Sequence, residues 1–142
     1  MKDIRLTILK AIALILIGLA LFLFFISLFE PVFITTEQPV LGYWVFAIGW
    51  MGFIILQFAW YANLLSFLSL LLMFKYPIRA FFLSLFSLLL ATESFLFNEI
   101  SHNVKIIDTD IGLYLWMGAH CAVLYASILM LIRNKMIEHE LD

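Results

Sequence analysis

Charged residues are scarce in this sequence. Lys, Arg, Asp and Glu make up 13% of the 142 residues, whereas 65% are hydrophobic. An average soluble domain carries about a quarter charged residues. The few polar side chains here could not cover a water-facing surface, so the composition excludes an ordinary soluble domain and indicates that lipid surrounds most of the chain.

Other shortages exclude further classes of protein. Cys121 is the single cysteine, which rules out an intramolecular disulfide and a thiolate metal cluster. The net charge of −2 and the lack of a basic stretch argue against a nucleic-acid partner. The sequence has no H-E-x-x-H, P-loop or G-x-S-x-G motif, and we therefore expect no enzyme activity, cofactor or metal site.

Long apolar stretches are abundant. A bilayer core about 30 Å thick is crossed by about 20 helical residues, which predicts an all-α, four-transmembrane-helix bundle forming one domain over 1–142. The second uncharged stretch, Gln38 to Phe74, is 37 residues long and could hold one long helix or two short ones. The expected spans are 8–29, 44–72, 78–97 and 111–132, with outer loops 30–43 and 98–110.

The distribution of Lys and Arg favours one long second helix. Three basic residues lie near the N-terminus, within residues 1–10, two lie in the turn at 75–79, two lie in the C-terminal tail, and Lys105 alone falls in an outer loop. Cytoplasmic loops are enriched in Lys and Arg, so this pattern predicts that both termini lie on the cytoplasmic side of the membrane. Residues 38–46 could extend the second span or lie at the interface.

Three polar residues inside the expected spans are candidate functional residues. Gln57, Glu93 and His120 could meet in the outer half of the bundle, and ionisable groups in a membrane are functional candidates by default. Three interpretations remain open: a structural hydrogen-bonded cluster, a proton- or ion-handling site, and a contact with another subunit.

Small residues form stripes on the expected helices, and these stripes allow close helix contact. Helical periodicity places Gln57, Glu93 and His120 away from the small stripes of their own helices. We therefore expect lateral docking on a membrane protein partner or a second copy, unless the small residues face lipid. The expected helix-contact residues are Asn63, Ser84, Ser87, Ala91, Gly118 and Ala122.

Two short motifs resemble those of a loose class of small bacterial inner-membrane proteins with four spans. One is Gly49-Trp50 followed by the segment 59–64, Ala-Trp-Tyr-Ala-Asn-Leu, and the other is 112–116, Gly-Leu-Tyr-Leu-Trp. In that class Pro often follows the Asn, but Leu64 stands here, which argues against a kink at Asn63. The resemblance covers the last three spans and implies a location in a bacterial inner membrane, but it implies no activity.

The sequence therefore predicts a small membrane accessory protein that binds another membrane component through its helix faces. Its size and expected topology also suit immunity proteins that protect against pore-forming bacteriocins. The alternative is a small oligomeric transporter or channel in which Glu93 and His120 couple to protons or ions.

Overall fold

Most of the chain is helical in the computed structural model, which describes residues 2–101 and 104–138. The α-helices are α1 (Lys2–Ser27), α2 (Gly42–Ile48), α3 (Ala62–Leu72), α4 (Pro77–Thr92) and α5 (Ile111–Glu138). The 3₁₀ helices are η1 (Gly49–Ile55), η2 (Ala59–Tyr61) and η3 (Glu93–Leu96). The strands are β1 (Pro31–Thr35), β2 (Val40–Leu41), β3 (Glu99–Ser101) and β4 (Val104–Thr109).

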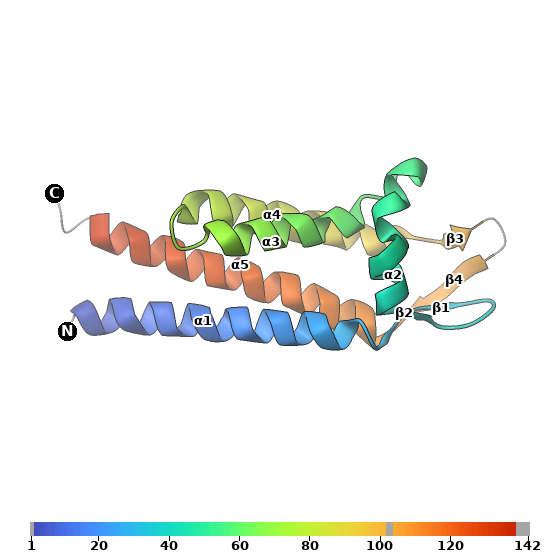
Figure 1. The fold of residues 1–142 in the computed structure, drawn as a ribbon, viewed down its shortest axis with the longest axis horizontal. Coiled ribbons are helices and arrows are strands. Elements are labelled where there is room, and N and C mark those ends of the chain that lie inside the picture. The colour runs from blue at the N-terminus through green and yellow to red at the C-terminus, as the bar shows by residue number, and fades with distance from the viewer. Residues whose placement is uncertain (1, 102–103, 139–142) are drawn as a thin grey trace.

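The long helices lie side by side, with α5 in the middle (Figure 1). Helix α1 packs along one side of α5, while α4 packs on α5 and α3 packs on α4. The start of α1, the end of α5 and the α3–α4 turn lie at one end of the bundle, which we call the turn end. The strands and α2 lie at the opposite end, the sheet end, where α2 crosses the direction of the long helices.

Three helical segments are long and apolar enough to cross a membrane, judged within the described residues. They are Asp3–Ser27, Pro77–Leu96 and Ile111–Glu138. The prediction of a mostly helical chain is therefore confirmed, and three of the four expected spans coincide with helices whose length and composition suit a membrane span. The segment Ala59–Leu72 is apolar but shorter.

The second expected span, 44–72, is not one continuous helix. The chain forms α2 and η1, reverses near Leu56 and Gln57, and then forms η2 and α3. Leu56 has φ 58° and ψ 34°, a left-handed conformation that ends η1. The aromatic and apolar residues on both sides of Leu56 carry no charge that would have marked this break in the sequence.

Two glycines allow the chain to fold back at this break. A Cβ atom on Gly49 would overlap the ring of Trp60, and one on Gly52 would overlap the carbonyl oxygen of Gln57. Glycine also weakens a regular helix by about 1 kcal/mol relative to alanine. The close approach of η2 to η1 therefore depends on both glycines and replaces the long helix that hydropathy alone predicts.

A four-stranded antiparallel sheet occupies the two expected outer loops. Its strand order is β2-β1-β4-β3, and β1 pairs with β4 through Phe33 opposite Thr109 and Ile34 opposite Asp108. The all-α prediction is wrong here. Both loops leave the bundle at the same end, and β-branched residues in 31–35 and 104–109 favour pairing, which satisfies their backbone groups.

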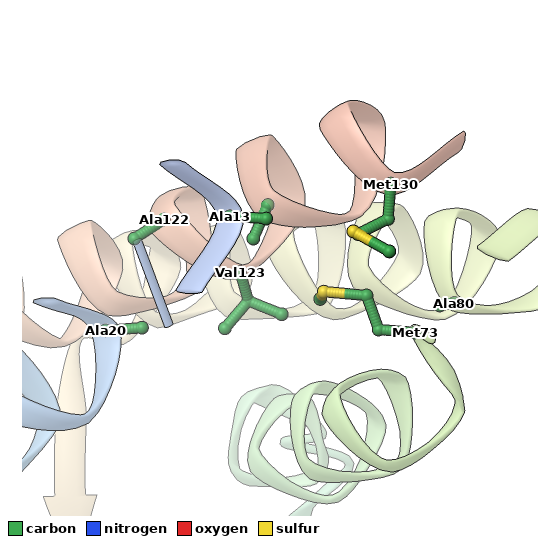
Figure 2. Close-up of a cluster of buried hydrophobic side chains, with 8 residues drawn as sticks. Ala13, Ala20, Met73, Ala80, Ala122, Val123 and Met130 are labelled. Atoms are coloured by element: carbon green, nitrogen blue, oxygen red, sulfur yellow. The ribbon is translucent and has the colours of Figure 1, made fainter. Parts of the chain in front are cut away.

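The core between the helices is built mainly from small residues. Ala13 and Ala20 of α1 meet Ala122 and Ala126 of α5, and all four side chains are buried. Figure 2 shows Ala13 and Ala20 beside α5, and it shows the side chains of Met73 and Met130 pointing toward each other in the same cluster. Small side chains let two helices approach closely enough for their backbones to pack, as in other membrane helix pairs.

The left-handed conformation of Leu56 makes a testable prediction. Its side chain is 74% exposed, so replacing it removes little buried surface. Leu56→Gly should unfold at the same or a higher temperature than the original protein, because glycine adopts this conformation without strain. Leu56→Val should lower the free energy of unfolding by about 1 kcal/mol, since a β-branched residue is more strained there. Thermal unfolding in detergent micelles measures both, and a less stable glycine variant would contradict the prediction.

Candidate functional site

His120 lies in the interior of the bundle, where α3, α4 and α5 meet. Its side chain is 2% exposed. The Nδ1 atom is 2.7 Å from Ser66 Oγ of α3 and 2.9 Å from Ser87 Oγ of α4, and the two hydroxyls are 2.8 Å apart. Ser87 also donates a hydrogen bond of 2.8 Å to the carbonyl oxygen of Ala62. We call Ser66, Ser87 and His120 the polar triad; it links three helices.

A second polar contact lies one turn of α5 nearer the sheet end. Trp116 donates its indole N–H to Asn63 Oδ1 at 2.8 Å, and Asn63 donates in turn to the carbonyl oxygen of Trp60 at 2.9 Å. The Trp116 ring packs edge-on against His120 with the ring centroids 4.6 Å apart. Asn63 therefore fixes both the start of α3 and the orientation of the Trp116 ring.

The expected helix-contact residues lie at packed helix surfaces. Ser84 Oγ is 2.8 Å from Ser127 Oγ of α5, and the side chains of Ala91 and Ala122 are buried. Gly118 faces α1, because a Cβ atom there would lie 3.3 Å from a methyl group of Leu23. Helix α5 thus buries its small stripe towards α1 and its polar residue His120 towards α3 and α4. Because helices pack on both sides of α5, its face of small residues and its face with His120 are both buried.

Glu93 has a separate role at the end of α4. Its carboxylate accepts a hydrogen bond of 2.7 Å from the backbone N–H of Phe58. Phe58 lies directly after the reversal at Leu56 and Gln57, where the regular helix hydrogen bonds are interrupted. Glu93 therefore satisfies a donor that the break leaves free and holds η2 against the end of α4.

Gln57 lines a cavity at the sheet end, which we call the outer cavity. It has a volume of about 370 Å³ and lies among α2, η1, the sheet and the ends of α1 and α5. Val32, Phe33 and Leu113 are the buried apolar residues at its sheet side. Trp60 also lines the cavity, but its indole N–H already donates to the backbone carbonyl oxygen of Phe46. The other lining residues with polar side-chain atoms are Ser27, Gln57, Asn63, Ser94, Glu99 and Trp116.

A groove of about 260 Å³ adjoins the outer cavity between α1 and α3. We call it the lateral groove. Ala20 and Leu21 line it on α1, Leu64 and Phe67 line it on α3, and His120 forms part of its floor. The groove and the outer cavity share four lining residues, Phe24, Phe46, Trp60 and Asn63.

The three polar residues expected to meet thus lie in different surroundings. His120 belongs to the polar triad, Glu93 binds the Phe58 amide, and Gln57 lines the outer cavity. Sequence reasoning missed Ser66 as a partner of His120 and Trp116 as a partner of Asn63. Ser66 and His120 lie 54 positions apart along the chain, so only the packing of α3 on α5 reveals their contact.

Comparison of this chain with protein-family models, curated proteins and solved structures finds no match.

The polar triad predicts unequal effects for two buried serines. Ser87→Ala should lower the free energy of unfolding by about 1–2 kcal/mol, because three hydrogen-bonding contacts across helices are lost. Ser94→Ala is the matched control: Ser94 is also buried, and its hydroxyl donates to Ala91 of its own helix. It should cost less than about 0.5 kcal/mol. Unfolding of the two variants in mixed micelles measures the difference, and equal losses would argue against a linking role for the triad.

The contact between Glu93 and Phe58 can be tested by hydrogen exchange. Glu93→Ala should speed exchange of the Phe58 amide by about ten-fold or more, because a hydrogen bond to a carboxylate is worth about 1.5–3 kcal/mol. Glu93→Gln keeps an acceptor and should give a smaller effect. Thr92→Ala, which removes a neighbouring hydroxyl bonded to Leu89, serves as control and should leave Phe58 unchanged. Unaltered exchange in Glu93→Ala would rule out this role.

Proposed function

We propose that this chain is a multi-pass protein of the bacterial inner membrane that binds another membrane component in the outer half of its bundle. In this arrangement α1, α3, α4 and α5 are the four helical segments in the bilayer, and both termini are cytoplasmic. Helix α2 and η1 lie along the outer interface, beside the sheet.

Charge placement supports this orientation. Seven of the eight Lys and Arg residues belong to segments at the turn end, and Lys105 lies in β4 at the sheet end. Six of the ten Asp and Glu residues belong to segments at the sheet end. A basic turn end on the cytoplasmic side follows the positive-inside rule.

The opening between α1 and α3 is the observation that carries the binding role. Helix α1 packs on α5, and within the described residues it makes few contacts with α3. The lateral groove therefore opens sideways, at the depth of lipid, and leads to the outer cavity. Binding sites in proteins are commonly apolar recesses of a few hundred Å³ with a small number of polar groups, and these two recesses have that character.

A binding role without catalysis is the simplest reading of this recess. An immunity-type protein, which would hold part of a toxin or its receptor in the membrane, is one version. In the rival role of a transporter, Glu93 and His120 would act as a coupled pair, but in the described structure they take part in separate hydrogen-bond networks.

The test is retention of a bound component after extraction of the full chain from its native membrane into polymer nanodiscs. Mass spectrometry of the intact complex should detect one retained component per chain. Leu64→Trp, at the edge of the lateral groove, should abolish retention. Leu71→Trp is the control, because Leu71 is an exposed residue of the same helix outside the groove lining. No retained component, or equal retention in both variants, would refute the proposed function.

A further inference from the structure

The turn between α3 and α4 carries two positive charges that no acidic residue of its own segment balances. Lys75 lies in this turn, and Arg79 lies in the first turn of α4. No Asp or Glu occurs within residues 38–92. The basic residues of α1 and α5 at the same end share their helices with acidic residues, Asp3 in α1 and Glu138 in α5. The α3–α4 turn is therefore a local excess of positive charge.

The ring of Tyr76 holds these two cations close to each other. Lys75 Nζ lies 5.2 Å from the centre of the ring, and Arg79 Cζ lies 5.0 Å from the same centre. A cation over an exposed aromatic ring gains only about 0.5–1 kcal/mol, and two like charges held at one ring repel each other. All three side chains are exposed, so an anion can reach both charged groups and remove this repulsion.

The length of the helix that follows sets the depth of this pair in the membrane. The segment Pro77–Leu96 has 20 residues. At about 1.5 Å per residue it is about 30 Å long, which matches the hydrocarbon core of a bilayer. In the orientation proposed above, Lys75 and Tyr76 then lie at the inner boundary of the core, beside the lipid phosphates. The start of α1 and the end of α5 extend beyond the α3–α4 turn (Figure 1).

Exposed apolar residues continue from the two cations along α4. Ile78, Phe82 and Phe86 are exposed and lie four positions apart, so they form one stripe, which we call the α4 stripe. Arg79 precedes Phe82 by three positions and therefore lies at the end of this stripe. A soluble phosphate would contact only the cations, whereas a phospholipid also covers the α4 stripe with an acyl chain. The arrangement therefore favours a lipid phosphate.

We propose that the α3–α4 turn binds an anionic phospholipid of the cytoplasmic leaflet. The lipid phosphate lies between Lys75 and Arg79 and accepts hydrogen bonds from both, and an acyl chain lies along the α4 stripe. Tyr76 is a positioning residue, because its ring holds the two cations near one another. The inference goes beyond the proposed function and shares only the orientation of the bundle with it, since the lateral groove takes no part in this contact.

The experiment measures lipid binding to the delipidated full chain in a non-ionic detergent by mass spectrometry of the intact complex. Phosphatidylglycerol is compared with phosphatidylcholine of the same acyl chains, whose phosphate is balanced by its own ammonium group. Phosphatidylglycerol should bind at least about five-fold more tightly, because a basic residue beside anionic lipid contributes about 1 kcal/mol. Added salt should reduce this preference. The deacylated headgroup, glycerophosphoglycerol, should not compete even in excess. These comparisons need no variant of the protein.

Matched variants locate the site. Lys75→Gln combined with Arg79→Gln should lower the affinity for phosphatidylglycerol to that for phosphatidylcholine. Lys10→Gln combined with Lys135→Gln removes the same charge from exposed positions of α1 and α5, and it should keep most of the preference. Tyr76→Leu should reduce the preference about three-fold, the effect of a lost cation–π contact, whereas Tyr76→Phe keeps the ring and should leave it unchanged. Thermal unfolding checks that each variant is folded.

The outcomes that overturn this inference differ from those that refute the proposed function. Equal affinity for the two lipids, or equal loss in the two double variants, would overturn the assignment to this turn. Competition by glycerophosphoglycerol would identify a soluble phosphate as the ligand and overturn the lipid assignment. Leu64→Trp should leave the preference for phosphatidylglycerol intact, and its loss there would place the lipid in the lateral groove instead. A component retained in the groove without lipid preference at the turn would overturn this inference alone.

Discussion

The contact among Ser66, Ser87 and His120 is the interaction on which the outer half of this molecule depends. It links α3, α4 and α5 through one imidazole ring and two hydroxyls, all of them buried. In a low-dielectric interior such a network is strong when its hydrogens are fully used. By holding α3 and α4 on one side of α5, it leaves α1 to pack on the other side, and the lateral groove lies between these two groups.

The break between α2 and α3 is the second feature that shapes the recess. Residues of both η1 and η2 line the outer cavity, and one continuous helix over 44–72 would not pack these two segments against each other. Instead, Gly49 and Gly52 let η2 return against η1, and Glu93 binds the amide left free at Phe58. Irregular backbone is tolerated where protein groups satisfy it, and here the Glu93 carboxylate, at the start of η3, does so. Glu93, a candidate ion-coupling residue in the sequence, thus holds in place the segment around Phe58 that borders the outer cavity.

Part of this structure could be predicted from the sequence and part could not. Hydropathy and length identified the helices that became α1, α4 and α5, because a span needs about 20 apolar residues whatever its neighbours are. The same signal failed over 38–74, since the residues around the break at Leu56 are as apolar as those of a continuous span. It also gave no sign of the sheet, whose pairing of β1 with β4 joins segments more than 70 positions apart.

The candidate residues show the same division. His120 and Glu93 were found because ionisable groups are rare in apolar helices, but their partners depend on which helix lies beside which. Composition by itself indicated that lipid surrounds most of the chain, since too few charged residues are present to cover a water-facing surface, and charge placement determined the expected orientation. Only the tertiary structure decided that His120 points to Ser66 and Ser87, that Glu93 binds a backbone amide, and that a recess opens between α1 and α3. The physical reason is that hydrophobicity and charge act residue by residue, whereas hydrogen-bond partners and cavities exist only once separate helices are packed together.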